Sequence, residues 1–339
     1  MSARRLSDDE TGALRRSLTS CQPSDAKRST RQIVLTFGLF VVLIAAMYAT
    51  VNVSIWLTLA LALPTAGLVV RIFILQHDCG HGSLFISRRA NDWIGRVCSL
   101  ATLTPYANWR RHHAGHHAVW NNLDRRESGT DIYSTCLTVS EYRRLSRVSR
   151  LFYRLVRHPL VALGLLPPVV FVLLYRLPFD TPKSWRRERL SVHATNLALV
   201  AMFVGMGLVL GFGNVARVQL PVITFAAIAG VWLFSIQHRF HAATWLKGDS
   251  WNAIAASLHG SSHLRLPQPL RWFSGDIGYH HVHHLNPRIP NYRLAECHDG
   301  NRVLDRVASI DLLQGMRAAR YWLWDEHRQR MVRFRDARR

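Results

Sequence analysis

The sequence is poor in cysteine and in acidic residues, and each shortage argues against a class of protein. Five cysteines occur among 339 residues, and none of them forms a Cys-x-x-Cys pair. An odd count without such pairs argues against a disulfide framework and against a zinc ribbon. Acidic residues number 21 against 43 lysines and arginines, so the formal net charge is +22. This basicity makes nucleic acid or a membrane-associated surface the first candidate partners.

Charged residues are missing altogether from residues 33–70. An apolar stretch of this length is sufficient for two membrane crossings of about 20 residues each. We therefore expect a helical hairpin whose two spans cover residues 33–51 and 53–75, with a turn near Asn52. Since residues 1–32 are polar, we expect no cleavable signal peptide before it.

A second apolar hairpin is expected over residues 193–212 and 218–236, with its turn at residues 211–214. Residues 160–174 are also apolar, but they number only 15 and contain Pro167-Pro168. A segment this short favours a re-entrant or in-plane position over a full crossing.

The basic residues test this topology. The polar regions 1–32, 77–158, 176–190 and 237–339 together hold 41 of the 43 lysines and arginines. Cytoplasmic segments of membrane proteins carry such an excess, so these regions are expected to face the cytoplasm. Because topology then explains the charge, a nucleic-acid partner is not expected.

These patterns predict an all-α polytopic membrane protein with two transmembrane hairpins, four spans, and a cytoplasmic helical domain. The expected parts follow in order: a flexible cytoplasmic leader (1–32), transmembrane hairpin 1 (33–75), a cytoplasmic region with a possible in-plane segment (76–191), transmembrane hairpin 2 (192–236), and a second cytoplasmic region ending in a basic amphipathic helix (237–339).

Ten of the 18 histidines gather in three short clusters. The first follows hairpin 1, and the second and third share the spacing His-x-x-His-His. Residues at i, i+3 and i+4 lie on one face of a helix, so each cluster can present its rings together while His281 points elsewhere. Three such clusters on one side of the membrane favour a shared metal site over solvated surface histidines. The candidate ligands are His77, His81, His113, His116, His117, His280, His283 and His284.

The number of imidazoles points to two metal ions. A zinc site usually has four ligands, so eight imidazoles exceed the needs of one zinc ion. His238 follows hairpin 2 at the height where the clusters should meet, and we expect it to be a ninth ligand. No cysteine lies at a ligand spacing, which disfavours iron–sulfur and blue-copper sites, whereas imidazole suits iron. Two irons at a membrane surface indicate the oxidation of a lipid, because an unactivated C–H bond resists acid–base chemistry.

Three carboxylates are candidates for orienting the imidazole N–H groups: Asp78, Asp124 and Asp131. Helix capping, or pairing with Arg125 and Arg126, is an equally open interpretation of their positions.

The motifs resemble those of the membrane-bound fatty acid desaturases, especially bacterial acyl-lipid desaturases of the Δ12/ω6-like branch. The resemblance covers about residues 33–335. Residues 278–292, GYHHVHHLNPRIPNY, are similar to the third histidine box of that family almost residue for residue. Residues 77–83 and 109–131 resemble the first and second boxes. One departure is His241, which stands where the family often has a glutamate.

The resemblance implies a non-haem di-iron centre held by the histidines named above, with O₂ as co-substrate and a membrane lipid acyl chain as substrate. It also implies an external electron donor of the ferredoxin or cytochrome b5 type, because no fused carrier domain is visible. The expected location is a bacterial inner membrane, with the histidine boxes on its cytoplasmic face.

Two alternatives stay open at this point. A di-iron hydroxylase or ketolase acting on a fatty acid, a carotenoid or an alkane would share the ligands and the oxidant, so only its products would distinguish it. A metal-binding transporter or sensor would place ionisable residues inside its spans. The expected spans are almost bare of such residues, which makes this second alternative remote.

Overall fold

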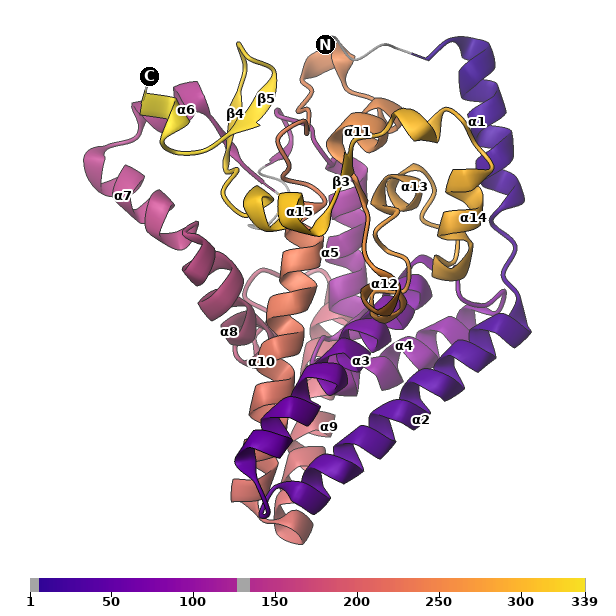
Figure 1. Cartoon of the computed structure of the whole chain (residues 1–339), viewed down its shortest axis with the longest axis vertical. Helices are drawn as coiled ribbons and strands as arrows, with labels where there is room; N and C mark the ends of the chain where they lie inside the picture. Colours follow the sequence, from indigo (N-terminus) through magenta and orange to yellow (C-terminus); the bar gives the residue numbers. More distant parts are fainter. Residues whose placement is uncertain (1–5, 127–134, 339) are drawn as a thin grey trace.

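Four long apolar helices dominate the computed structural model, which describes residues 6–126 and 135–338 (Figure 1). Among the described residues, the helices long and apolar enough to cross a membrane are α2 (Ala26–Thr50), α3 (Ile55–His81), α9 (Arg186–Leu210) and α10 (Phe212–Ile236). The first two are joined by a turn at residues 51–53, and the other two meet at Gly211, whose φ of +83° suits glycine. The predicted four spans in two hairpins are therefore confirmed.

The spans extend further than their apolar runs. Helix α2 begins at Ala26, where the Asp25 side chain accepts hydrogen bonds from the backbone N–H groups of Lys27 and Arg28. Helix α9 begins at Arg186, and α3 continues as far as His81. Hydropathy identifies only the apolar part of a helix, so the polar turns beyond it were not predicted. In α3 those additional turns carry the first histidine cluster.

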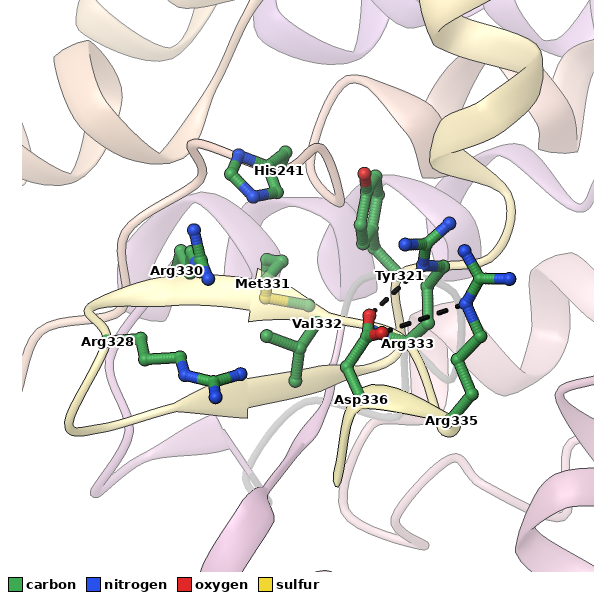
Figure 2. A pocket seen from close by; sticks show the side chains of 9 residues that line it. All are labelled: His241, Tyr321, Arg328, Arg330, Met331, Val332, Arg333, Arg335 and Asp336. Atoms are coloured by element: carbon green, nitrogen blue, oxygen red, sulfur yellow. Dashed lines mark hydrogen bonds and ion pairs between the residues drawn. The ribbon is translucent and has the colours of Figure 1, made fainter. Parts of the chain in front are cut away.

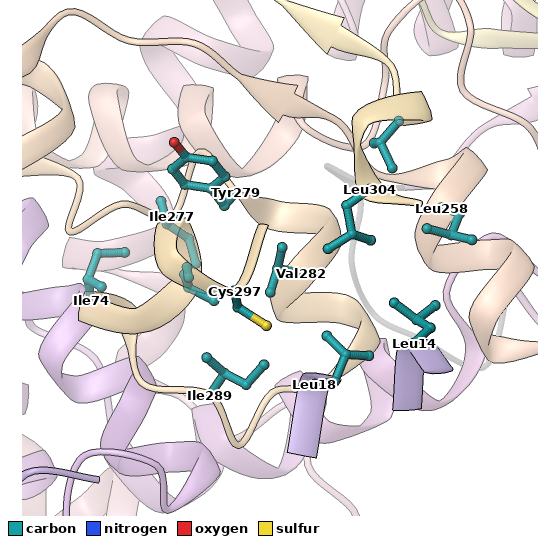
Figure 3. Close-up of a cluster of buried hydrophobic side chains, with 12 residues drawn as sticks. Leu14, Leu18, Ile74, Leu258, Ile277, Tyr279, Val282, Ile289, Cys297 and Leu304 are labelled. Atoms are coloured by element: carbon teal, nitrogen blue, oxygen red, sulfur yellow. The ribbon is translucent and has the colours of Figure 1, made fainter. Parts of the chain in front are cut away.

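The leader differs from the flexible segment expected over residues 1–32. Helix α1 (Asp8–Ser20) begins with a capping box in which Ser7 and Glu10 satisfy each other's backbone N–H groups. Its Leu14 and Leu18 are buried in a hydrophobic cluster that includes Val282 of the third histidine cluster (Figure 3). Two leucines four residues apart are enough to give a short helix one buried face. In a segment that is otherwise polar, two apolar residues do not predict a packed helix.

Shorter helices surround the histidine-bearing ends of the spans. Their bounds are α4 (Arg88–Thr102), α5 (Tyr106–Val119), α6 (Val139–Arg144), α7 (Arg147–Val156), α8 (Leu166–Val172), α11 (Ala253–Gly260), α12 (Gln268–Phe273), α13 (His280–Leu285), α14 (Leu294–Asp299) and α15 (Leu312–Ala318). A π-helical turn, Leu160–Leu165, leads into α8, and the stretch Leu160–Arg176 is bent by 47° relative to α7. This broken helix lies where the in-plane or re-entrant segment is expected.

The C-terminal region corrects the prediction of a basic amphipathic helix. Among the described residues 303–338, α15 is the only α-helix, and it is followed by the antiparallel strands β4 (Leu323–Asp325) and β5 (Arg330–Val332). Strand β4 also pairs in parallel with β1 (Leu137–Thr138). The helical prediction was wrong because the aromatic run that ends at Trp324 is buried in this sheet. The Asp325 carboxylate closes the hairpin by accepting hydrogen bonds from two backbone N–H groups of the turn.

A second pair of short strands, β2 (His263–Leu264) and β3 (Ser309–Ile310), runs in parallel beside α13. Because every strand in the described part of the chain is only two or three residues long, the expected all-α class is confirmed.

Candidate metal centre

Nine histidines from four segments meet at one end of the helix bundle. Helix α3 supplies two of them in its last turns, helix α5 and helix α13 supply three each, and one follows the last residue of α10. These are the nine residues that the sequence predicts as ligands. They divide into two sets, here called the first set and the second set.

The first set contains five histidines whose nearest ring nitrogens all lie within 4.8 Å of one another: His77, His81, His113, His117 and His283. The Nε2 atom of His283 is 3.1 Å from that of His77 and 3.0 Å from that of His117. The Nε2 atoms of His117 and His113 are 3.2 Å apart.

The second set is built around His238, which contributes with His116 and His284 to a second group within 4.8 Å. The Nε2 atom of His238 lies 3.2 Å from that of His116 and 2.9 Å from that of His280. The Nε2 atom of His280 is also 3.2 Å from that of His284, so we count His280 as the fourth member.

Helices α5 and α13 each contribute to both sets. In α5, the i, i+4 pair His113 and His117 belongs to the first set and His116 to the second. In α13 the arrangement is reversed, since the i, i+4 pair His280 and His284 belongs to the second set. The rings of His117 and His284 are stacked with centroids 4.3 Å apart, so the two sets are in direct contact.

The nitrogen geometry fits metal ions. Two nitrogens that each lie about 2.1 Å from one ion are about 3.0–3.4 Å apart at bond angles of about 90–109°. The Nε2–Nε2 separations within the two sets, 2.9–3.2 Å, fall close to this range. A hydrogen bond between two neutral imidazoles that face each other through Nε2 requires one ring to donate and the other to accept. The Nε2 atom of His81 is buried with no hydrogen-bond partner among the described residues. A cation between the rings would satisfy all of these lone pairs.

The surroundings keep these imidazoles in the form that binds metal. Six of the candidate ligands outside the membrane-spanning helices have an imidazole whose pKa is well below its usual value. Burial is the main cause, and the neighbouring histidines add to it. The six are His113, His117, His238, His280, His283 and His284. These side chains are therefore neutral at physiological pH, as a metal ligand must be.

The three candidate carboxylates differ in their positions. Asp78 is buried, with Oδ1 3.4 Å from Nδ1 of His77 and with Oδ2 accepting a 2.8 Å hydrogen bond from the backbone N–H of Asn291. It therefore links the first and third histidine clusters. Asp124 instead accepts a hydrogen bond from the backbone N–H of Gly248, which joins two loops. Asp131 lies outside the described residues.

His281 points away from both sets, as the helical spacing predicts. Its Nε2 atom lies 2.9 Å from Nδ1 of His298 on α14, and both rings lie near His263. This contact ties α13 to α14 behind the candidate ligands.

Two tryptophans beside the site were not predicted. The Trp109 ring stacks on His113 with centroids 4.7 Å apart, and the Trp120 ring lies 3.8 Å from that of His238. Trp109 is three residues before His112 and four before His113 in the second cluster, so its helical position could have revealed this contact. Trp120 has the same signal, because it is four residues after His116 and the two ring centroids are 5.1 Å apart; only its contact with His238 joins distant segments.

The comparisons with known proteins agree on one family. Residues 54–308 match the family described as "Fatty acid desaturase". A protein named "Fatty acid desaturase" from Bacillus subtilis (strain 168) is 40% identical over 311 residues, which cover 92% of this chain and 87% of the relative.

Two relatives from Synechocystis sp. have more specific names. An "sn-1 oleoyl-lipid 12-desaturase" is 24% identical over 283 residues, covering 82% of this chain and 77% of the relative. An "sn-1 acyl-lipid omega-3 desaturase (ferredoxin)" is 28% identical over 230 residues, covering 66% of this chain and 61% of the relative.

Proposed function

This chain belongs to the fatty acid desaturase family, and from this membership we propose that it introduces a double bond into the acyl chain of a membrane lipid. The observation that carries the proposal is the convergence of nine histidines into two adjacent sets at the ends of the spans. An oxidoreductase of this family acts on an acyl chain, and a site at the end of a span lies at a depth that such a chain can reach.

We propose that each set holds one iron ion. The first set would supply five imidazoles, and the second set would supply His116, His238, His280 and His284. When bound, two non-haem irons would provide the O₂ activation that removal of hydrogen from an unactivated C–H bond requires. The protein's own contribution is to hold neutral imidazoles in place, by burial and by contacts such as the one between Asp78 and His77.

The overall reaction requires an electron donor. Two hydrogens leave adjacent carbons of the acyl chain, and with two further electrons and two protons they reduce O₂ to two molecules of water. The proposed donor is a separate carrier protein of the ferredoxin or cytochrome b5 type. One relative is named for ferredoxin, which supports the first of these two types.

The chain is a multi-pass membrane protein, and we propose that its histidine-bearing end faces the cytoplasm of a bacterial inner membrane. The basic residues support this orientation, since 41 of 43 lie in the regions 1–32, 77–158, 176–190 and 237–339. In this arrangement residues 33–75 and 192–236 contain the membrane crossings, while residues 76–191 and 237–339 form the cytoplasmic domain.

Expression in a bacterial host with simple lipids, followed by mass spectrometry of its fatty acids, tests this function. We expect a new double bond at one defined position, absent from cells that express His283→Ala. Hydroxylated products would instead assign the chain to the hydroxylase class. Purified protein that holds about one zinc and no iron would overturn the di-iron proposal.

A further inference from the structure

A basic cavity of about 530 Å³ lies between the hairpin of strands β4 and β5 and the segment that follows α10. Figure 2 shows the nine side chains that line it: His241, Tyr321, Arg328, Arg330, Met331, Val332, Arg333, Arg335 and Asp336. The cavity is distinct from the metal centre, because none of the nine candidate ligands lines it.

The lining carries a large excess of positive charge. It contains four arginines and one carboxylate, and three of the arginines, Arg328, Arg330 and Arg335, are exposed. The single carboxylate of the lining, Asp336, lies 3.0 Å from Arg333 and 3.7 Å from Arg335 (Figure 2). Asp325, outside the lining, lies 3.7 Å from Arg328, so two carboxylates compensate only part of the charge of four arginines. His241 adds no carboxylate to the lining. The cavity therefore suits a partner that presents several negative charges.

The cavity is close to the candidate metal centre. His241 is three residues beyond His238, and its carbonyl oxygen accepts a 3.1 Å hydrogen bond from the backbone N–H of Met331. Met331 lies in the cavity wall and in the same hydrophobic cluster as Trp120. The Trp120 ring in turn lies 3.8 Å from the His238 ring. A partner seated in the cavity would thus be separated from the second set by this cluster.

The position in the fold favours a soluble partner over a lipid headgroup. Strands β4 and β5 lie at the end of the molecule opposite to the turns of the two transmembrane hairpins (Figure 1). In the proposed orientation this end lies on the aqueous side of the membrane. An acidic protein can therefore approach the exposed arginines directly, and they would attract it over about one Debye length.

We propose that this basic cavity is the docking site for the acidic carrier protein that delivers electrons to the metal centre. This inference rests on the proposed desaturase function, which requires two electrons from outside the chain for each double bond. Complementary charge at such a surface chiefly increases the rate of association and fixes the orientation of the partner. Arg328, Arg330 and Arg335 would supply that charge, and the hydrophobic cluster of Met331 and Trp120 would lie between the carrier and the second set.

The test measures the binding of an acidic [2Fe–2S] ferredoxin to the full-length, iron-loaded protein in nanodiscs. In the variant R328Q/R330Q/R335Q we expect the Kd for this ferredoxin to rise about tenfold, since three exposed charges that attract the partner are removed. The dependence of Kd on salt should weaken in parallel. Ferredoxin-supported turnover should show a similar increase in KM, whereas activity supported by a small chemical reductant should be unchanged.

The matched control is R15Q/R16Q/R144Q, which removes three exposed arginines from α1 and α6. Equal losses of ferredoxin affinity in both triple variants would show that only net charge matters, and would overturn the docking site. Unchanged affinity in R328Q/R330Q/R335Q would also overturn it. So would a variant that binds ferredoxin normally but loses binding to phosphatidylglycerol vesicles, because the arginines would then serve a lipid.

The two proposals can fail separately. If the wild-type protein forms no double bonds with ferredoxin or with the chemical reductant, the desaturase function fails, and the difference in Kd still decides the docking site. If the wild-type protein forms double bonds and the variant has the same KM for ferredoxin, only the docking site fails.

Discussion

The Nε2 atoms of His238 and His280 lie 2.9 Å apart although 42 residues separate them in the sequence. His238 belongs to none of the three histidine clusters, yet it has ring contacts with three members of its set. A single histidine placed just after α10 is therefore held as close to the other members of the second set as the clustered histidines are to one another.

Replacing His238 with alanine should remove one metal ion and leave the other. Without its imidazole the second set retains three histidines, and the first set is untouched. We expect the iron content to fall from about two to about one per chain, with loss of double-bond formation, as measured by metal analysis and by lipid mass spectrometry. The exposed His327→Ala is the control and should retain both irons. Two irons in His238→Ala would contradict the assignment of the ninth ligand.

Two histidines only two positions apart should differ in their importance. His283 faces the first set, whereas His281 faces His298. We expect His283→Ala to abolish activity and to lower the iron content, and we expect His281→Ala to retain part of both. Metal analysis and lipid mass spectrometry measure these two effects. Equal loss in the two variants would show that α13 does not present its faces as described.

Asp78→Asn should weaken the retention of metal. One carboxylate oxygen lies beside Nδ1 of His77 and the other accepts the backbone N–H of Asn291, so an amide, which has one acceptor oxygen in place of two, could not keep both contacts. Changes to such supporting groups typically reduce metal affinity about 10–100-fold. Iron loss to a chelator over time measures the effect. Asp124→Asn is the control, because its carboxylate bonds to Gly248 instead, and a similar iron loss in that variant would argue against a specific role for Asp78.

Leu14→Ala should destabilise the protein although it lies in the leader. Its side chain is 1% exposed and packs in the cluster that contains Val282. Truncating a buried leucine usually lowers the free energy of unfolding by about 2–5 kcal/mol. The midpoint of thermal unfolding of the full chain should fall accordingly, whereas the exposed Arg16→Ala should leave it nearly unchanged. An unchanged midpoint of thermal unfolding in Leu14→Ala would contradict the packing of α1 and support a flexible leader.

Single cysteines should report the proposed orientation. Four of the five natural cysteines are buried, so the background labelling by a thiol reagent should be low. We expect a membrane-impermeant reagent to label Asn52→Cys in spheroplasts, and to label His327→Cys only after the membrane is opened. The reverse pattern would place the histidines on the outer face.

The sequence predicted eight of the nine histidines because their spacing depends only on the helical repeat, and it predicted His238 from its place directly after hairpin 2. It also predicted that His281 faces away from the other three members of its cluster. The division into two sets could not be predicted, because spacing gives the face of a helix but not the neighbour that the face meets. Thus His116 separates from His117, its immediate neighbour, and lies beside His238, which follows α10, instead.

The errors in the fold have a related cause. The aromatic run ending at Trp324 was assigned to the same basic amphipathic helix as Leu312 and Met316, and only its pairing with the distant strand β1 and with β5 shows that it is a strand. The contact between Trp120 and His238, and the hydrogen bond from Asn291 to Asp78, likewise join segments far apart in the chain. Such contacts are properties of the assembled structure, and a single sequence does not reveal them.

Both sets take histidines from early and late parts of the chain, and this has a consequence for how the protein is made. The first set requires His77 and His283, and the second requires His116 and His284, so neither is complete until α13 has left the ribosome. Both hairpins precede α13 in synthesis. Metal insertion is therefore expected to be one of the last steps of biogenesis, and a chain truncated before α13 would contain the spans but lack a complete set of ligands.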